Sequence, residues 1–283
     1  MSVPSSLKCG PHTTLLLVKK RYLFFYIFLI WISIFTIQFE LWLLWKLYEP
    51  RFIHFLILLP LLIFVMYITS ITVSLIFAKI FLVVVNLIHK PREGIFLRDP
   101  SDKDYRYWCL RSIIKKWPLW LSHKFPFPFM DNICLKLFGI RTKYSNSLFE
   151  AFIDTELIDF GKNVVCGQSA LIQSAVIVGN LFILRKTVLE DNVMVGAHSV
   201  VMPGTHIKKN SILAGSSMTT VGQVLEENFI YIGAPAKKYK KNVFFEDGLE
   251  DIIERQFKEE AISASQYEDF YTVRKDKDTK SQS

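Results

Sequence analysis

The sequence lacks the cysteine spacing of a metal site. Its four cysteines, Cys9, Cys109, Cys134 and Cys166, are scattered through 283 residues, and no two have the short spacing of a zinc-ligand pair. We therefore expect free thiols in a reducing compartment and no bound metal. Zinc fingers and other recognisable nucleic-acid modules are also missing, so we expect no nucleic-acid partner.

The apolar fraction is high for a chain that carries many charges. Hydrophobic residues make up 51% of the sequence, charged residues 21%, and the mean hydropathy is +0.28. This combination predicts apolar segments kept apart from a soluble part, within one or two domains. Lysines that contribute to the net charge of +8 cluster beside the apolar segments and at residues 237–241. Such clusters suit anionic lipid headgroups or the phosphates of a cofactor.

Two apolar runs of membrane-spanning length follow an N-terminal tail (residues 1–21). They cover Leu23 to Leu43 and Phe55 to Ala78, with a short polar link at residues 49–51. A span needs ~20 apolar residues. The first run is too long for a signal-peptide core, and no small-residue cleavage site follows it. Residues 22–89 therefore predict a transmembrane helical hairpin; the alternative is a buried core hairpin in a soluble protein.

Basic residues indicate the orientation of this hairpin. Three of them, at 19–21, precede the first run, and Lys79, His89, Lys90 and Arg92 lie at or after the end of the second. The link region has fewer. Because cytoplasmic flanks carry the excess of Lys and Arg, we expect a multi-pass membrane protein with both termini and its soluble part in the cytoplasm.

A six-residue period organises the second half of the chain. An aliphatic residue recurs at every sixth position: Ile177, Ile183, Leu189, Val195, Val201, Ile207 and Leu213. Four residues after each, except at Leu181, comes a small or β-branched residue: Thr187, Val193, Ser199, Thr205, Ser211 and Ser217. This period predicts a parallel β-helix in which three hexads form a triangular coil of eighteen residues. An ordinary sandwich with coincidental spacing is the disfavoured alternative.

The period has two interruptions. Backwards it reaches Phe160, but one residue is missing between Ile172 and Ile177, which predicts a slip or loop at Ser174–Ala175. Forwards, Thr219 replaces an aliphatic residue, and the frame resumes six residues later. We expect about four coils.

Coil geometry selects a candidate site. With eighteen residues per coil, Asn180, His198 and Ser216 should stack at one outward corner and offer an amide, a base and a hydroxyl. Histidine suits a general base because its pKa lies near neutrality, although a histidine at a solvated turn is the simpler explanation. His206 is a second, less favoured base. Two histidines do not supply the three convergent ligands of a metal-dependent β-helix enzyme.

Asparagines form a second column with the same spacing. Asparagine tolerates left-handed turn geometry, so we interpret these residues as structural. They are Asn192, Asn210 and Asn228.

Three segments resemble the left-handed β-helix of hexapeptide acyltransferases. They are VGAHSVVMPGT at residues 195–205, LAGSS at 213–217 and YIGAPAKK at 231–238. The resemblance implies a mainly β chain, with a left-handed parallel β-helix acyltransferase-like domain at residues 137–241 after the helical hairpin. It also implies a homotrimer that uses acetyl-CoA or another acyl-CoA as co-substrate in clefts between subunits. The acceptor would be a hydroxyl or amine of a sugar, lipid-linked or small molecule.

The same resemblance suggests residues that bind coenzyme A. Small side chains would line the pantetheine arm, a closing turn would follow the last coil, and lysines would meet the phosphates as charge-assisted donors. These residues are Ala214, Gly215, Gly233, Pro235, Ala236, Lys237 and Lys238. A membrane-facing basic patch is the alternative for the lysines.

One departure from the family keeps a second hypothesis open. Relatives often carry a histidine in the loop after the coil that matches Cys166 to Gln173, where this chain has Ser174 and Ala175. The alternative function is therefore a non-catalytic trimeric β-helix scaffold or partner-binding membrane protein.

Two flanking regions complete the predicted organisation. Residues 90–136 form an amphipathic connector, in which Arg111, Lys115 and Lys116 alternate with apolar residues. This helix would either lie flat in the headgroup layer or pack against the first coil. Residues 242–283 predict a short C-terminal helix, starting near Phe244, and a charged tail.

The turn sequence KPREG after an apolar helix, followed by a Tyr- and Arg-containing helix and LFGI before the coils, narrows the resemblance. It is similar to the membrane-associated C-terminal acyltransferase-like region of polylysine synthetase and related non-ribosomal peptide synthetase-like proteins. In those proteins apolar helices precede a β-helix. Nothing before residue 137 has the phosphate-binding loop of an adenylation domain, so amino-acid polymerisation is not implied.

Overall fold

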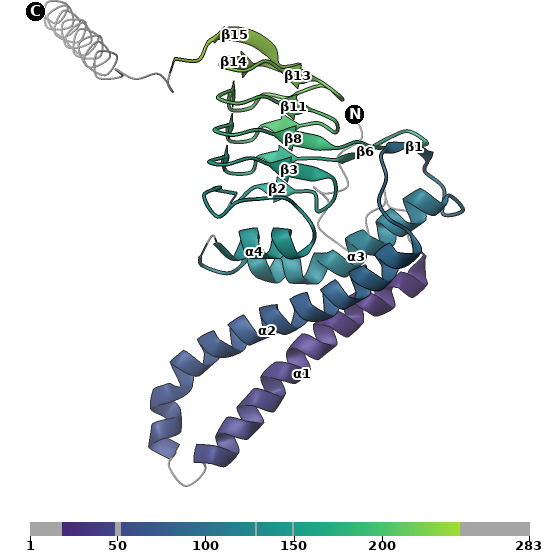
Figure 1. Cartoon of the computed structure of the whole chain (residues 1–283). Coiled ribbons are helices and arrows are strands. Elements are labelled where there is room, and N and C mark those ends of the chain that lie inside the picture. Colours follow the sequence, from purple (N-terminus) through teal and green to yellow (C-terminus); the bar gives the residue numbers. More distant parts are fainter. Residues whose placement is uncertain (1–18, 49–51, 128, 149, 244–283) are drawn as a thin grey trace, which may run out of the picture. The chain divides into compact units, whose positions relative to one another are not determined.

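The computed structural model describes residues 19–48, 52–127, 129–148 and 150–243. The first eighteen residues of the expected N-terminal tail, and the C-terminal helix expected from Phe244, lie outside the described residues. The features below belong to the unit that ends at Lys241 (Figure 1).

Two long helices form a hairpin at the start of the described chain. A 3-10 turn, η2 (Lys20–Tyr22), leads into α1 (Leu23–Tyr48), and α2 (Phe52–Ile88) runs back beside it (Figure 1). By length and composition both helices could cross a membrane, over Lys20–Leu47 and Phe52–Ile88. In their most apolar windows only 11% and 17% of the residues are buried. The hairpin therefore presents apolar side chains outward along most of its length.

Helices α3 (Lys103–His123) and α4 (Phe129–Leu137) lie between the hairpin and the strands (Figure 1). Helix α3 starts at an N-cap, where Asp102 accepts a hydrogen bond from the backbone N–H of Tyr105. On the hairpin side, the Trp117 indole donates to the Ser33 hydroxyl (3.0 Å) and the Tyr67 hydroxyl donates to the Leu121 carbonyl (2.8 Å). These bonds tie α3 to both helices of the hairpin.

The other side of α3 decides between the two predictions for the connector. Arg111 and Lys115 are only 1% and 3% exposed, and both contact Glu156 next to the first coils, at 2.6 and 2.8 Å. The expectation that these basic residues lie in a headgroup layer is therefore wrong. The alternative, a helix packed against the coils, is confirmed.

Parallel strands stack into three walls. One wall holds β4 (Val165–Cys166), β9 (Met194–Val195), β12 (Ile212–Leu213) and β14 (Phe229–Ile232). The second holds β3 (Ile158–Phe160), β8 (Thr187–Leu189), β11 (His206–Ile207) and β13 (Val224–Leu225). The third holds β2 (Phe152–Ile153), β5 (Leu171–Ile172) and β10 (Val200–Val201). A last strand, β15 (Lys237–Lys241), pairs with β14 in the antiparallel direction.

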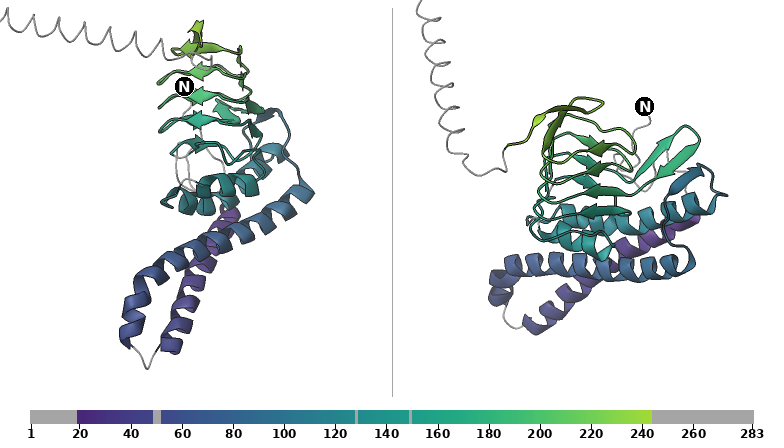
Figure 2. Two further views of the ribbon diagram at one scale, coloured as in Figure 1. Left: turned by 60° about the vertical axis from the view of Figure 1, so that its left-hand side comes forward. Right: turned by 45° about the horizontal axis from the view of Figure 1, so that its top comes forward.

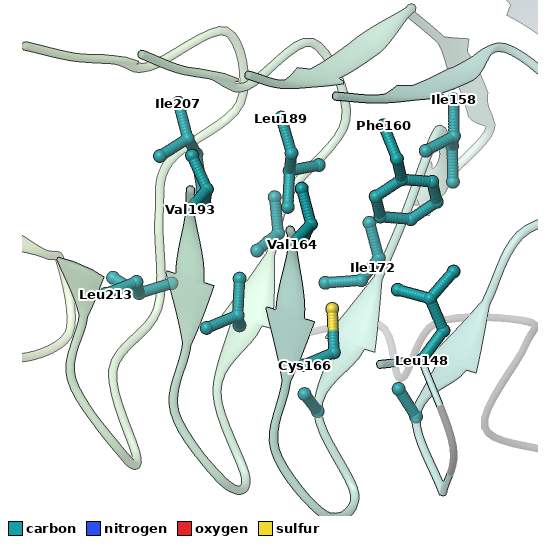
Figure 3. Packing of buried hydrophobic residues seen from close by; sticks show 14 of the residues in the cluster. Leu148, Ile158, Phe160, Val164, Cys166, Ile172, Leu189, Val193, Ile207 and Leu213 are labelled. Carbon is teal, nitrogen blue, oxygen red and sulfur yellow. The ribbon is translucent and has the colours of Figure 1, made fainter. Parts of the chain in front are cut away.

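The expected six-residue period fills the interior of this stack (Figure 3). Its aliphatic residues are at most 2% exposed: Leu189, Val195, Val201, Ile207 and Leu213. Four residues later the small residues are buried too, and the hydroxyls of the Ser and Thr members bond to carbonyls; Ser199 Oγ, for example, donates to Ala214 O at 2.8 Å. Thr219, which replaces an aliphatic residue, is fully buried, and its Oγ1 lies 2.9 Å from Thr205 Oγ1. A hydrogen-bonded pair therefore takes the place of apolar packing there.

Two members of the predicted period do not belong to the coils. Ile177 and Ile183 lie in β6 (Ala175–Val178) and β7 (Leu181–Leu184), an antiparallel hairpin that leaves the stack at Ala175. Strand β1 (Gly94–Leu97) pairs with β7, and we call β1, β6 and β7 the arm (Figures 1 and 2).

The interruption expected at Ser174–Ala175 is thus the base of an inserted hairpin. Ile177 matches the six-residue period because the face of the arm that packs on α3 needs apolar residues, whereas Ile183 lies on the other face of β7. The residues of this contact are Ile177, Phe182 and Leu184 on the arm and Tyr105, Trp108 and Cys109 on α3.

Candidate functional site

One corner of the coil stack carries the predicted histidine. His198 lies in the turn between β9 and β10 with φ of 57°, and Ser216 holds the same place in the next coil with φ of 56°. The turns are bonded to each other, since the Ser216 N–H donates to Ala197 O (2.9 Å) and the His198 N–H donates to Gln168 O (3.0 Å). The expected stacking of His198 on Ser216 is confirmed.

The third predicted member of this corner is wrong. Asn180 lies at the turn of the arm, where its carbonyl accepts the N–H of Arg98 at 2.8 Å. Ser169, with φ of 56°, occupies the corner place below His198 instead. The signal in the sequence was the recurring turn pattern of a small residue, any residue and a polar residue, at 167–169, 196–198 and 214–216.

Small residues bring these turns close together. A side chain at Gly167 would place its Cβ 2.5 Å from the Ala197 nitrogen, and one at Gly196 would meet the backbone of Ala214 and Gly215. Both glycines are therefore required by the close approach of successive turns. The corner presents backbone, a hydroxyl at Ser216 and the exposed imidazole of His198. Within the described residues, that imidazole makes no hydrogen bond.

Apolar stripes flank this corner on both walls. Outward-facing residues on one side are Val165, Met194 and Ile212, and on the other Phe152, Leu171, Val200 and Met218, of which Leu171 is buried. Three of them, Val165, Phe152 and Met194, are 37–40% exposed. Exposed apolar stripes beside a polar edge are typical of a surface that another molecule covers.

The second histidine belongs to a different arrangement. His206 Nε2 lies 2.6 Å from Glu190 Oε1, and Glu190 Oε2 accepts the Lys209 N–H at 3.1 Å. A carboxylate on one ring nitrogen orients an imidazole and fixes which nitrogen carries the proton. Glu190 also lines a cleft of about 650 Å³, together with residues 140–143, Asp159, Asp191 and Lys209. The corner spacing in the sequence does not indicate this pair, because His206 lies in strand β11 and not at a corner of the coil.

The residues expected to bind coenzyme A lie at the end of the stack. Gly233 has φ of 92°, and its N–H donates to Ser217 Oγ (3.0 Å). The Ala236 N–H donates to Met218 O (2.7 Å), so the segment with Pro235 closes over the coil that carries Ser216. Ala214 and Gly215 lie in the turn of that same coil, against Gly196. The structure thus brings the small-residue turn and the closing turn to the same coil.

Two lysines follow the closing turn on β15. Lys237 and Lys238 are exposed. Lys238 Nζ is 2.6 Å from Glu226 Oε2 and 3.5 Å from the centre of the Phe229 ring. The hydrogen bond from Lys238 and its positive charge lower the pKa of the Glu226 carboxyl. A phosphate that binds Lys238 therefore competes with Glu226.

Asparagine side chains form the expected structural column. Their amides link successive coils, from Asn163 Nδ2 to Asn192 Oδ1 (3.1 Å), from Asn192 to Asn210 (3.0 Å) and from Asn210 to Asn228 (3.0 Å). All four have φ between 55° and 61°. Asn163 extends the predicted column by one coil.

Charged groups are buried where the arm leaves the stack. The backbone N–H groups of Ser174 and Ala175 donate to Asp154 Oδ2 (2.9 and 3.1 Å). Burial raises the pKa of Asp154 to about 6. Burial also lowers the pKa of Lys115. For Glu156 burial opposes ionisation, but Lys115 and Arg111 hold the pKa of its carboxyl below the ordinary value. This cluster joins α3 to the coils at Ser174 and Ala175, and its charged side chains are buried.

Cysteines and metal ligands offer no further site in the part of the chain that the structure describes. Cys109 and Cys166 are buried free thiols, and burial raises the pKa of each to about 12. They are protonated at neutral pH and therefore weak nucleophiles. Over the same residues, no group of three His, Cys, Asp or Glu side chains could hold a metal ion.

No protein-family model matches the sequence, and no curated protein matches it. Among solved structures, the chain is similar to a variant of AntD, an N-acyltransferase from Bacillus cereus in complex with dTDP-4-amino-4,6-dideoxyglucose and coenzyme A. The two are 19% identical over 36% of this chain and 60% of AntD, less than two thirds of its length, with a TM-score of 0.29.

Two further solved structures have similar values. A maltose O-acetyltransferase from Clostridium difficile 630 is 18% identical over 43% of this chain and 81% of the other, with a TM-score of 0.34. A hexapeptide-repeat-containing acetyltransferase from Vibrio cholerae, VCA0836 in complex with acetyl coenzyme A, is 17% identical over 50% and 91%, also with a TM-score of 0.34. At such low TM-scores these similarities assign no activity to this chain.

Proposed function

We propose that this chain is a membrane-anchored acyltransferase, with acetyl-CoA or another acyl-CoA as donor and a hydroxyl or amine of a sugar, lipid-linked or small molecule as acceptor. The observation that carries the proposal is the corner where the exposed His198 lies on the small-residue turn of Ala214, Gly215 and Ser216. The closing turn at Gly233 to Ala236 bonds to the same coil. Acyl transfer from a thioester needs a base and a surface that holds the donor. The exposed backbone of this turn and the closing turn would supply that surface.

His198 acts as the general base in this proposal. The acceptor nucleophile attacks the thioester carbonyl while the imidazole takes its proton. The new C–O or C–N bond forms, and the C–S bond breaks when the tetrahedral intermediate collapses. His198 then returns the proton to the departing thiolate. The Ser216 hydroxyl, in the turn bonded to that of His198, is the candidate donor to the oxyanion on this corner. Asn180 cannot take this role because it lies in the arm.

The donor would lie along the corner and end at β15. Backbone groups at Ala214 and Gly215 would hydrogen-bond the pantetheine amides. Lys237 and Lys238 would meet the phosphates, with Lys238 leaving Glu226 as it does so.

We propose a left-handed coil and a homotrimer, in keeping with the sequence resemblance. The apolar stripes beside His198 support the trimer, because the wall of a second copy would cover them and enclose the imidazole. Water would then be excluded from the thioester, which raises the strength of the electrostatic contacts in the site.

The exposed apolar hairpin supports membrane anchoring. Ile53, Ile57 and Leu87 are 70–79% exposed. Leaving such surface in water costs about 25 cal/mol per Å². Together with the flanking basic residues, this favours two spans with the termini and coils in the cytoplasm, where acyl-CoA is available. The order of apolar helices before coils also supports the narrower resemblance to the polylysine synthetase region.

Binding of the donor tests the proposal. We would titrate the detergent-purified full chain with acetyl-CoA and with a longer acyl-CoA by calorimetry. Saturable binding near one site per chain is expected, and it should weaken when Gly215 is replaced by Leu. No binding of either donor at millimolar concentration would overturn the transferase and favour the alternative, a trimeric scaffold.

A further inference from the structure

The turn between α3 and α4 exposes aromatic side chains in one cluster. We call Phe125, Phe127 and Phe129 the aromatic turn. Phe127 and Phe129 are 49% and 48% exposed, whereas Phe125 is 2% exposed and contacts both of their rings. The rings of Phe125 and Phe127 lie 5.6 Å apart, and those of Phe127 and Phe129 are stacked at 5.9 Å. Such a cluster is unfavourable in water and needs a partner.

The aromatic turn joins the outer surface of the hairpin. Phe125 stacks on Phe64 of α2 (6.0 Å) and lies 5.9 Å from the ring of Tyr67. Phe64 and the neighbouring Leu61 are themselves exposed, at 39% and 62%. The apolar surface therefore continues without a break from α2 onto the turn.

The position along α2 indicates what covers this surface. No Asp, Glu, Lys or Arg occurs in α2 between Phe52 and Ala78, and His54 is its one histidine. This stretch is about 40 Å long at about 1.5 Å per residue. Phe64 lies only about 20 Å from the start of this stretch by the same measure, whereas the hydrocarbon core of a bilayer is ~30 Å thick. On the far side of the turn, Ile76 and Ile80 still expose about half of their surface, at 53% and 50%. The lipid-facing surface of α2 thus extends past the aromatic turn in both directions.

We infer that the aromatic turn is embedded in the hydrocarbon layer of the bilayer, beside the hairpin. Helix α4 would then lie at the membrane surface, and the coils that begin at Ile140 directly after it would stand on the headgroups. This inference rests on the proposed membrane anchoring. It adds that the first coils of the β-helix lie against the bilayer. An acceptor at the lipid surface would then be within reach of the β-helix.

Depth-dependent quenching of a fluorescent label tests this inference. In a full-length Cys9→Ser background, the remaining cysteines are buried and protonated, so bimane labels an introduced thiol selectively. We would label Phe127→Cys and reconstitute the protein into phosphatidylcholine vesicles that carry a nitroxide on the acyl chain. Loss of most of the bimane emission is expected, with less loss when the nitroxide is on the headgroup.

Two matched positions separate this inference from the anchoring on which it rests. Leu61→Cys, on the hairpin, should be quenched whenever α2 is in lipid. Tyr239→Cys, which is 62% exposed on β15, should not be quenched. Quenching at Leu61 with none at Phe127 beyond the Tyr239 level would overturn the embedded turn alone. No quenching at Leu61 would overturn the membrane anchoring, and the inference with it.

Discussion

Replacing Arg111 by Leu should weaken the joint between α3 and the coils. The Arg111 side chain is fully buried, its Nε lies 2.6 Å from Glu156 Oε1, and one terminal nitrogen donates to His89 O at 3.1 Å. Its removal leaves Glu156 with Lys115 as its remaining cationic partner among the described residues. Breaking a buried ion pair from one side costs about 3–5 kcal/mol, which is a large part of the stability of an ordinary domain.

Thermal unfolding of the detergent-solubilised protein, followed by circular dichroism, measures this effect. The matched control is Arg141→Leu, which breaks a pair with Asp159 that is 3.5 Å long and whose arginine is 80% exposed. Exposed pairs contribute about 0–1 kcal/mol, so the control should melt close to the unmodified chain. The triple variant R111L/K115L/E156L should lose less stability than Arg111→Leu alone, because it leaves no unpaired charge of this group buried. Equal melting of the Arg111 and Arg141 variants would refute the reasoning.

The remaining predictions concern the site and its surroundings. His198→Ala should lower kcat for acetyl transfer by about 10²- to 10⁴-fold while His206→Ala keeps most of the rate; the reverse order would move the base to the cleft beside Glu190. Reversing Lys237 and Lys238 to Glu should weaken acetyl-CoA binding in calorimetry by about tenfold or more, and an unchanged affinity would remove these lysines from the phosphate site. The pKa of Asp154 is raised from 3.8 to about 6, so its native form binds more protons than the unfolded chain between these values, and stability should fall as the pH rises through this window. Asp154→Asn should flatten that part of the melting-temperature profile, and an identical slope in both proteins would contradict the assignment.

Regular spacing made most of the coil stack predictable. From Leu189 to Leu213 the period runs without insertion, so one residue in six could be placed in the core from the sequence. His198 and Ser216 lie within this run, and their stacking followed from it. Ser169 could not be placed, because the arm lies between it and His198 and breaks the eighteen-residue count.

The features that could not be predicted from the sequence depend on contacts between residues far apart in the chain. Ile177 and Ile183 satisfy the period but lie in the arm. Ile177 packs against α3, whose position is not encoded in local spacing. Arg111 resembled a surface residue because its partner, Glu156, is 45 residues away along the chain. Charge patterns on a helix indicate exposure only when no distant counter-charge is brought to it.

Strand β1 also has a consequence for the order in which the protein is made. It follows α2 directly, yet its partner β7 is translated much later, since Leu97 pairs with Leu181. At about 5–20 residues per second, the edge of β1 waits on the order of ten seconds for its neighbour. Helices α1 and α2 are synthesised first and can insert into the proposed bilayer before the coils are made. The arm therefore forms late, when β7 pairs with β1, which is already folded onto the helices, while the later coils are still being synthesised.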